Sequence, residues 1–355
     1  MKEIVLTDHF GDGGAERVAS LLVKGLSDNG NDEVHVCLFE DKFNYDIDST
    51  KVTIHILSSI HYPHFFNVLN RIKNLIKIIK EIVPDKIYSF GPIMASYVVL
   101  SVMLSGKRKK IKIISSERND PRQEPVSDLK KKIRDFCYNK SDVIVCQTQM
   151  VIDLLQKRNI KSKFVIIPNP ISRHLPQWNG INSKDIISAA RLTEQKNLPL
   201  LINAFLRIHN EFPQYRLIIY GEGEQRKELQ ALITQKGLNG VVKLPGFVKD
   251  IHKIMSNAYM YVSSSDYEGI SNSMLEALGI GLPCVCTDCP VGGAAMYIEN
   301  GVTGILTRPA CEDELYEGMK RYIIDKDFLL HVSQNSVVIR NQLVLDQITK
   351  KWIQL

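Results

Sequence analysis

The segment "YMYVSSSDYEGISNSMLEALGIGLPCVCTD" (residues 259–288) contains a strand-like run, a glycine loop, a helical pattern and a second strand-like run. Strands that alternate with helices in this way form parallel sheets. Ligands of such sheets bind beyond the carboxyl ends of the strands. The loop after Ser265 is therefore a candidate site. It places one acid, Glu268, just before a helix that carries a second acid, Glu276.

The same alternation extends along both halves of the chain. In the N-terminal half, strand patterns cover residues 2–10, 32–39, 85–90, 111–116, 142–148 and 163–169, and helical patterns cover 15–26, 67–83, 92–104, 128–140 and 149–158. In the C-terminal half, strand patterns cover 185–192, 215–221, 241–246, 259–265, 283–288 and 303–308, and helical patterns cover 197–212, 225–237, 252–258, 271–281 and 327–355. Each half predicts an α/β domain with a doubly wound parallel sheet.

The domain boundary falls where this alternation stops. A chain of 355 residues exceeds the size at which one hydrophobic core usually stops growing. The segment "NPISRHLPQWNGINSK" (169–184) interrupts the pattern with prolines, a glycine and polar residues, as a linker does. We expect an N-terminal domain over 1–172, a C-terminal domain over 173–335 and a last helix over 336–355.

The composition is that of a globular protein in a reducing compartment. Hydrophobic residues make up 44% of the chain and charged residues 24%. Acidic residues such as Asp8 and Glu16 argue against a secretory signal peptide. The apolar stretch at 91–106 is too short to span a membrane, so we expect a buried core helix there. Seven cysteines, an odd number, favour free thiols, and these features predict a cytoplasmic location.

Positive charge is concentrated in the N-terminal half. Residues 1–175 hold 27 lysines and arginines against 20 acidic residues, and residues 69–140 alone hold 17 against 7. Such a field favours an anionic partner, which is a membrane surface, a phosphorylated lipid or a nucleic acid. The helix at 67–83 carries Lys73, Lys77 and Lys80 largely opposite its apolar face. We expect attachment to anionic lipid, with a solvated basic face as the alternative, and no nucleic-acid recognition motif is present.

The loop after Ser265 has the features of a phosphate site. Gly269 lets the backbone come close to a ligand, and the amides from Ile270 to Ser273 open a helix whose dipole favours a phosphate. Glu268 and Glu276 would then accept hydrogen bonds from the sugars on either side of a diphosphate. The alternative is a loop acid and a solvated helix acid.

A second loop adds positive charge to this site. It follows the strand pattern at 185–192 and contains Arg191 and Lys196, a planar fork and a point charge that suit a pyrophosphate. An arginine and a lysine at this spacing are, taken alone, common surface residues.

Several motifs together resemble one family of enzymes. "ARLTEQKN" (190–197), "YGEGEQRKEL" (220–229), "VKLPGFVKDI" (242–251) and the opening segment are similar to the C-terminal domain of GT-B glycosyltransferases of the retaining family 4 type. "GGAERVASLL" (13–22) and "SSERNDPR" (115–122) resemble members that build bacterial polysaccharides or lipid-linked oligosaccharides. The resemblance implies two Rossmann-like domains that face each other across a cleft, with the last helix returning to the first domain.

The resemblance also implies roles for the donor residues. Arg191 and Lys196 would neutralise the diphosphate of a nucleotide sugar. Glu276 would hold the ribose hydroxyls, and Glu268 would hold the transferred sugar near the reacting carbon. The remaining donor contacts would come from the amides of Ile270, Ser271, Asn272 and Ser273, from Gly221, Gly223, Phe247 and Val248 around the nucleoside, and from Gly13 and Gly14 of the N-terminal domain.

Candidates for the acceptor side lie in the N-terminal half. Many relatives carry a histidine in the loop where this chain has Glu117 and Arg118. Glu117 is a candidate catalytic residue that accepts from the acceptor hydroxyl or the sugar, and Arg118 is a candidate ligand for an acceptor phosphate. A structural salt bridge is the alternative. His61 and Phe65, in the aromatic segment "HYPHFF" (61–66), are candidates for contact with the acceptor or the membrane interface.

The resemblance implies a hexosyltransferase-type reaction. Breaking the bond between the anomeric carbon and phosphate leaves negative charge on the diphosphate, which cations and helix amides stabilise, so we expect no metal and no cofactor. The family implies retention of configuration. UDP is the expected carrier by analogy. A glycan or a polyprenyl-diphosphate-linked glycan is the expected acceptor, at the cytoplasmic face of the membrane.

Other functions are kept as alternatives. A dinucleotide-dependent oxidoreductase fits poorly, because Glu16 takes the place of the third glycine of G-x-G-x-x-G. A nucleotide-sugar 2-epimerase shares the architecture, and a non-catalytic subunit that binds nucleotide sugar is a further alternative. Cys284, Cys286 and Cys289 lie close together without a fourth ligand at a zinc-like spacing, so no metal site is predicted.

Overall fold

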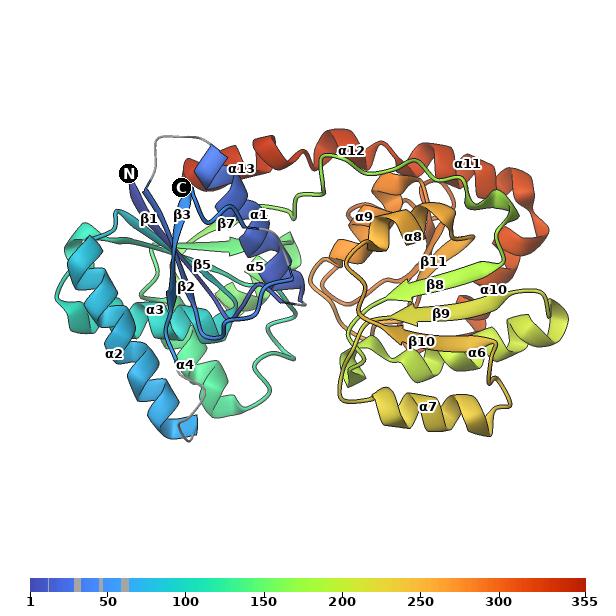
Figure 1. Cartoon of the computed structure of the whole chain (residues 1–355), viewed down its shortest axis with the longest axis horizontal. Coiled ribbons are helices and arrows are strands. Elements are labelled where there is room, and N and C mark those ends of the chain that lie inside the picture. Colours follow the sequence, from blue (N-terminus) through green and yellow to red (C-terminus); the bar gives the residue numbers. More distant parts are fainter. Residues whose placement is uncertain (12, 29–32, 45–46, 59–63) are drawn as a thin grey trace. The chain divides into compact units, whose positions relative to one another are not determined.

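The chain folds into two compact α/β units, each built on one parallel sheet (Figure 1). The computed structural model describes residues 1–11, 13–28, 33–44, 47–58 and 64–355. Unit 1 comprises Met1–Pro170 and Leu345–Leu355, and unit 2 comprises Ile171–Val344. The observed architecture agrees with the α/β class and the doubly wound parallel sheets expected from the sequence.

Unit 1 contains a seven-stranded sheet in the order β3-β2-β1-β4-β5-β6-β7. Its elements are β1 (Lys2–Thr7), α1 (Gly14–Asp28), β2 (Glu33–Leu38), β3 (Val52–Ile56), α2 (His64–Ile82), β4 (Lys86–Phe90), α3 (Pro92–Ser105), β5 (Lys112–Ser116), α4 (Asp128–Tyr138), β6 (Val143–Cys146), α5 (Gln149–Lys157), β7 (Lys163–Ile166) and α13 (Leu345–Ile353). In the register of the sheet, Val5 of β1 lies between Val36 of β2 and Tyr88 of β4. The central strands are buried on both faces and read as continuous apolar runs for that reason.

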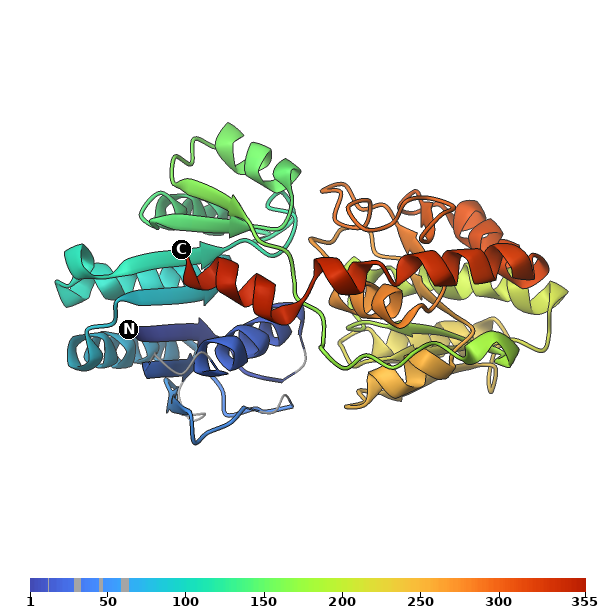
Figure 2. The ribbon, with the colours of Figure 1, turned by 90° about the horizontal axis from the view of Figure 1, so that it is seen from above.

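Helices cover both faces of this sheet. On one face α1 and α13 pack on the strands, with Leu22 and Trp352 in the core. Figure 2 shows α13, in red, returning to lie beside α1 within unit 1. On the other face α2, α3 and α4 pack on the strands through Leu75, Val98 and Cys137.

Unit 2 contains a six-stranded sheet in the order β10-β9-β8-β11-β12-β13. Its elements are β8 (Asp185–Ala189), α6 (Leu198–Glu211), β9 (Arg216–Tyr220), α7 (Arg226–Gln235), β10 (Val242–Gly246), α8 (Ile251–Asn257), β11 (Met260–Ser263), α9 (Asn272–Ile280), β12 (Cys284–Thr287), β13 (Ile305–Thr307), α10 (Glu312–Ile324), α11 (Lys326–Ser336) and α12 (Ile339–Gln342). The core on one face is formed with α6, α7, α10 and α11, and the core on the other with α8, α9 and α12.

The direction of winding reverses once in each sheet. The reversal lies between β1 and β4 in unit 1 and between β8 and β11 in unit 2. At such a switch point the following segments leave toward opposite faces and open a crevice in which ligands bind. In unit 2 the loops 190–197 and 264–271 both start there, so the fold brings the predicted donor residues to one place.

The end of the chain differs from the single helix expected over 327–355. Helix α11 ends at Ser336, the short α12 follows, and α13 begins only at Leu345. Between α12 and α13 the backbone pairs with the interdomain segment, because the amide of Ile171 donates to the carbonyl of Leu343 at 3.1 Å and Ile171 bridges Val344. Unit 1 therefore takes up the chain at Leu345, later than the position 336 expected from the sequence.

Two elements, the cysteines and the helix lengths also bear on what the sequence led us to expect. Strand β3 and helix α10 were not anticipated. All seven cysteines are free thiols, as expected. Within the described ranges no helix has the length and apolar character needed to cross a bilayer.

Helices α1 and α13 approach closely at Gly25. A Cβ atom at this position would lie 2.3 Å from Oγ1 of Thr349. We therefore expect Gly25→Ala to lower the free energy of unfolding by about 1–3 kcal/mol, because the added methyl group has no space. Urea unfolding checks this. Adding Thr349→Ala should restore part of the loss, and a Gly25→Ala protein at least as stable as the wild type would contradict the packing.

Candidate active site

Two loops of unit 2 carry most of the predicted donor residues. The loop after β8 contains Arg191 and ends in a short 3-10 turn over Glu194–Lys196, followed by Asn197. Asn197 has φ +42° and ψ +50°, a left-handed conformation that asparagine tolerates, and its side chain caps α6. The loop after β11 runs from Ser264 to Ser271, which caps α9.

Side chains of the two loops are bound to each other. Nζ of Lys196 forms an ion pair with Oε1 of Glu268, and the two side chains are only 14% and 16% exposed. Oγ of Ser265 donates to the same carboxylate oxygen at 3.0 Å. Nε2 of Gln195 donates to the carbonyl of Tyr267 at 2.8 Å and to Oε2 of Glu268 at 3.4 Å. The structure thus brings two predicted catalytic residues together.

Further contacts lock the same loops. Nδ2 of Asn197 donates to Oδ1 of Asp266 at 2.8 Å, and the amide of Asp266 donates to the carbonyl of Gln195 at 3.0 Å. Oγ of Ser264 donates to the carbonyl of Lys196 at 2.9 Å. We call the interlocked set of Gln195, Lys196, Asn197, Asp266 and Glu268 the donor clasp. Its cation and its acid are held by neighbours on both loops, so their positions are set before a ligand arrives.

The start of α9 follows the clasp directly in the chain. Oγ of Ser271 accepts from the amide of Met274 at 3.4 Å. Oγ of Ser273 donates to the carbonyl of Ala189 at 2.9 Å, which ties the first turn of α9 to the end of β8. Asn272 and Ser273 form the start of the first turn, where the helix dipole favours negative charge. This end of α9 is suited to a phosphate.

Backbone packing explains the two predicted glycines after β9. A Cβ at Gly221 would lie 2.0 Å from the carbonyl oxygen of Ala190, and one at Gly223 would lie 2.3 Å from that of Leu192. Glycine therefore lets the loop after β9 contact the loop that carries the clasp. Phe247 is exposed, and its neighbour Val248 is half-buried in the loop after β10.

Glu276 contacts a residue that the sequence did not single out. It is buried in α9, and its Oε2 lies 3.0 Å from Nε2 of His252 in α8, without the alignment of a hydrogen bond.

Arg191 differs from the other charged residues of the site because its side chain is exposed. In the part of the chain that the structure describes, no ion pair or hydrogen bond engages that side chain, so it is available to an anion.

Glu117 is buried within its own loop. It is 1% exposed, its Oε1 accepts from the amides of Arg118 and Asn119 at 3.0 and 3.3 Å, and its Oε2 accepts from the hydroxyl of Tyr138 at 3.1 Å. Burial raises the pKa of Glu117 to about 7, against the opposing effects of Arg134 and these hydrogen bonds. The carboxylate of Glu117 therefore organises its own loop in this structure, as the structural alternative expects, and a catalytic role for it stays a prediction.

Arg118 lies at the carboxyl end of the sheet of unit 1. Its guanidinium donates to Oδ1 of Asn169 and, at 3.4 Å, to Oγ of Ser116, and its central carbon lies 5.9 Å from the ring centre of Phe90. Burial lowers the pKa of Arg118 to about 10, so the group is a cation at neutral pH. Arg118 is half-buried, so it remains a candidate ligand for an anion.

The other predicted residues of unit 1 lie near the start of α1 or outside the described part. The amide of Arg17 donates to the carbonyl of Gly13 at 3.0 Å, and Gly14 begins α1. A Cβ at Gly13 would lie 1.9 Å from the carboxylate of Glu16, so glycine lets that acid fold back over the helix start. His61 lies outside the described residues, and the side chain of Phe65 is not described.

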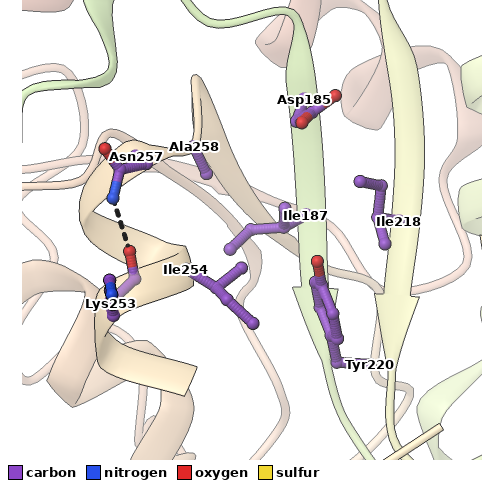
Figure 3. A pocket seen from close by; sticks show the side chains of 8 residues that line it. All are labelled: Asp185, Ile187, Ile218, Tyr220, Lys253, Ile254, Asn257 and Ala258. Carbon is purple, nitrogen blue, oxygen red and sulfur yellow. Dashed lines mark hydrogen bonds between the residues drawn. The ribbon is translucent and has the colours of Figure 1, made fainter. Parts of the chain in front are cut away.

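A hollow of about 310 Å³ opens beside α8 (Figure 3). Ile187, Ile218 and Ile254 line it, and Asp185 among its lining residues is paired with Arg216. None of its lining residues belongs to the donor clasp. Among the described residues no cluster of histidine, cysteine and acidic side chains is suited to a metal ion. The hollow therefore adds no residue to the candidate site.

Comparison with known proteins assigns both units. Residues 12–174 match the model for Glycosyltransferase Family 4, and residues 176–337 match the model for Glycosyl transferases group 1. The chain belongs to the GT-B glycosyltransferases. The glycosyltransferase family and the two Rossmann-like domains implied by the resemblance are therefore confirmed, whereas retention of configuration, the cleft and the roles of individual residues stay predictions.

Relatives and solved structures span nearly the whole glycosyltransferase chain. It is 28% identical over 334 residues to N-acetylgalactosamine-N,N'-diacetylbacillosaminyl-diphospho-undecaprenol 4-alpha-N-acetylgalactosaminyltransferase of Campylobacter jejuni, covering 89% of this chain and 88% of the relative. It is 26% identical over 362 residues to the amylovoran biosynthesis glycosyltransferase AmsD of Erwinia amylovora, covering 99% and 98%. The structure of Anabaena Alr3699/HepE with UDP and glucose has a TM-score of 0.87 at 20% identity, covering 100% and 98%.

The sequence missed four residues of the site, and only one had a local signal. Asn197 stands in "KNLP", where an asparagine before a leucine and a proline is typical of a helix start. Gln195, Asp266 and His252 have no such signal, because each meets its partner only through the folded sheet.

The clasp predicts that Asn197 positions its neighbour Lys196. Asn197→Gly keeps the left-handed backbone, which glycine adopts freely, and removes the bond to Asp266. We expect transfer to slow by about tenfold, because a small displacement of a charged group is costly, while binding of free nucleotide changes little. Asn159→Gly is the matched control, since Asn159 also has positive φ but lies in an exposed turn of unit 1. Equal effects of the two changes would contradict this role.

The buried carboxyl of Glu117 predicts a pH dependence of stability. Its pKa is raised from 4.5 to about 7, so the folded state binds a proton in this range that the unfolded chain has lost. This contribution is fully present below about pH 4.5 and is lost as the pH rises through about 7. The stability advantage of the wild type over Glu117→Gln should therefore shrink by up to about 3 kcal/mol between pH 5 and pH 8 in urea unfolding. A pH-independent difference would refute the shift.

Proposed function

We propose that the enzyme transfers a hexose, with retention of configuration, from a UDP-sugar to a glycan or a polyprenyl-diphosphate-linked glycan. The observation that carries the donor assignment is the pairing of Lys196 with Glu268 at the switch point of unit 2. Structural neighbours support UDP, since one solved structure is that of Anabaena Alr3699/HepE in complex with UDP-glucose. The name of the Campylobacter jejuni relative supports a lipid-linked acceptor, since it contains diphospho-undecaprenol.

The donor diphosphate binds at the first turn of α9. The amides of Asn272 and Ser273 donate to its oxygens, and Lys196 exchanges Glu268 for the phosphate. Arg191 is exposed and reaches the same charge from the other side of the loop after β8. Ser265 and Gln195 keep Glu268 in place after the exchange, so that its carboxylate accepts from hydroxyls of the transferred sugar.

The nucleoside occupies the neighbouring loops. Glu276 accepts from the ribose hydroxyls, and His252 faces its carboxylate from α8. Phe247 and Val248 contact the base, while Gly221 and Gly223 permit the close backbone packing beneath it. Gly13 and Gly14, at the start of α1, are the donor contacts that we assign to unit 1.

The reaction exchanges one bond for another at the anomeric carbon. The bond from this carbon to the phosphate oxygen breaks, and a bond to the acceptor hydroxyl oxygen forms on the same face. The acceptor proton ends on the departing diphosphate or in solvent. Lys196, Arg191 and the helix amides stabilise the negative charge that develops on the leaving group, and this is the main source of acceleration. Glu268 is assigned no nucleophilic role.

The acceptor side is assigned to unit 1. Arg118 is the cation at the carboxyl end of that sheet and is suited to an acceptor phosphate. The basic excess of the N-terminal half, including Lys73, Lys77 and Lys80, draws the enzyme toward the anionic cytoplasmic face of a membrane. A lipid-linked acceptor would be met there.

Substitution of the diphosphate ligands tests the donor assignment. Lys196→Ala and Arg191→Ala should each lower kcat by about a hundredfold or more, because each removes a charge that stabilises the leaving group. Lys236→Ala, an exposed lysine at the end of α7, is the control and should be neutral. Near-normal transfer by either active-site variant would remove the diphosphate role. Thermal stabilisation by a panel of UDP- and GDP-sugars then identifies the donor, and no shift with any of them would refute the function.

A further inference from the structure

Helix α4 has an inverted surface. Leu129, Ile133 and Phe136 share one side of the helix and are 69%, 42% and 49% exposed. The opposite side buries Arg134, which is 1% exposed and donates through Nη1 to the carbonyl of Pro121 at 2.7 Å. Helices of globular proteins usually bury the apolar side and expose the charged side. The apolar stripe of α4 contributes nothing to the core, so it calls for another partner.

Helix α3 extends this apolar surface. It packs against both α2 and α4 on the same face of the sheet of unit 1, as Figure 1 shows. It contains no charged residue, and Leu100, Met103 and Leu104 near its end are exposed. We expected a buried core helix from its composition. The structure buries only the side that faces the sheet.

Lysines surround the apolar residues. On α2, the exposed side begins with Phe66 and Leu69, and the same side continues with Lys73, Lys77 and Lys80. Exposed lysines also follow α3 and lie on or just beyond α4, at Lys109, Lys110, Lys130, Lys132 and Lys140.

The acidic residues on this face are few: Asp128 is exposed at the start of α4, and two others are engaged in ion pairs. Glu81 on α2 pairs with Lys77 at 3.9 Å. Asp135 on α4 pairs with Arg134 at 2.9 Å and with Arg158 at 2.7 Å. The charge left on the exposed sides of α2, α3 and α4 is therefore positive. We call these exposed sides, with the lysines just listed, the apolar-basic face.

We propose that the apolar-basic face seats the enzyme on an anionic lipid bilayer, with the stripe of α4 and the end of α3 in the interface. Lysine side chains reach headgroup phosphates from such a position, because their aliphatic stems lie along apolar surface. The surface is separate from the donor clasp, and the inference rests on the proposed function only for its reason to meet a lipid-linked acceptor.

Charge decides between a bilayer and a second copy of the chain. Two copies docked through this face would bring lysines against lysines, which opposes association. An anionic bilayer supplies the opposite charge, and it also accepts apolar side chains. Basic residues alone would attract the protein without insertion. If the apolar stripe of α4 enters the bilayer, removing its apolar side chains should weaken binding even though every lysine is kept.

The experiment measures co-sedimentation of the full chain with two kinds of vesicle. One is phosphatidylcholine alone, and the other contains about a third phosphatidylglycerol as the anionic lipid. The wild type should bind the anionic vesicles. Ile133→Ser/Phe136→Ser should weaken this binding by about tenfold or more, since each loses buried apolar surface. Ile324→Ser/Val338→Ser removes two apolar residues of unit 2 that are 64% and 50% exposed, and it should leave binding unchanged.

Salt and lysine variants separate the two contributions. Neutralising Lys73, Lys77 and Lys80 with glutamine should weaken the preference for anionic vesicles without removing it, because the lysines beside α3 and α4 remain. The α4 variant should keep a weaker, strongly salt-dependent binding. Unchanged binding by the α4 variant overturns the inference, and so does failure of the wild type to bind anionic vesicles at low salt. A wild-type dimer that the α4 variant converts to a monomer in the absence of lipid would identify a self-association surface and also overturn it.

Donor hydrolysis in the same preparations separates this inference from the proposed function. The α4 variant should hydrolyse a UDP-sugar at the wild-type rate, because its changed residues lie outside the clasp. A wild type that binds vesicles but no nucleotide sugar would refute the function and leave the surface standing. A wild type that hydrolyses the donor but does not bind vesicles would refute the membrane surface and leave the proposed function standing.

Discussion

The reversal of winding between β8 and β11 is the constraint on which the proposed donor site depends. Two parallel strands end side by side, and their following helices leave toward opposite faces of the sheet, so no helix covers the gap. Lys196 and Glu268 meet in that gap although 72 positions separate them in the chain. Both side chains are largely withdrawn from water, where their attraction is screened less than at the surface. The sheet, and no local motif, makes them a pair.

The sequence predicts what depends on local pattern and misses what depends on packing between distant segments. Apolar runs located the central strands, because strands buried on both faces leave a continuous signal. The edge strand β3 was missed, since its half-buried "VTIHI" is a weaker signal. The break before α13 was missed because it comes from pairing of Ile171 with Val344. Gln195 and His252 were missed for the same kind of reason, as their partners lie on other elements.

Unit 1 shows why charged residues are harder to place than apolar ones. The loop "SSERNDPR" presents an acid and a base at the end of β5, and the sequence does not reveal which of them points inward. The structure turns Glu117 in, where two amides and Tyr138 bind it, and directs Arg118 toward Asn169. Helix α4 repeats the lesson. From the sequence, either the apolar or the basic side of α4 could face the core. The structure turns Arg134 inward, where it donates to the carbonyl of Pro121.

The two units share a fold, yet their strand ends present different charges. Unit 2 pairs Lys196 with Glu268 at its switch point, whereas unit 1 presents Arg118 after β5, one strand beyond its own switch point. There Glu117 is buried, and burial raises its pKa to about 7, while the guanidinium of Arg118 is held by the neutral amide oxygen of Asn169. A site with one such cation is suited to a single anionic group, whereas the clasp with Arg191 and the α9 amides is suited to a diphosphate. In the reaction proposed above, similar backbones would take different substrates through the few side chains at their strand ends, while the outer helices are free to adapt to where the enzyme works.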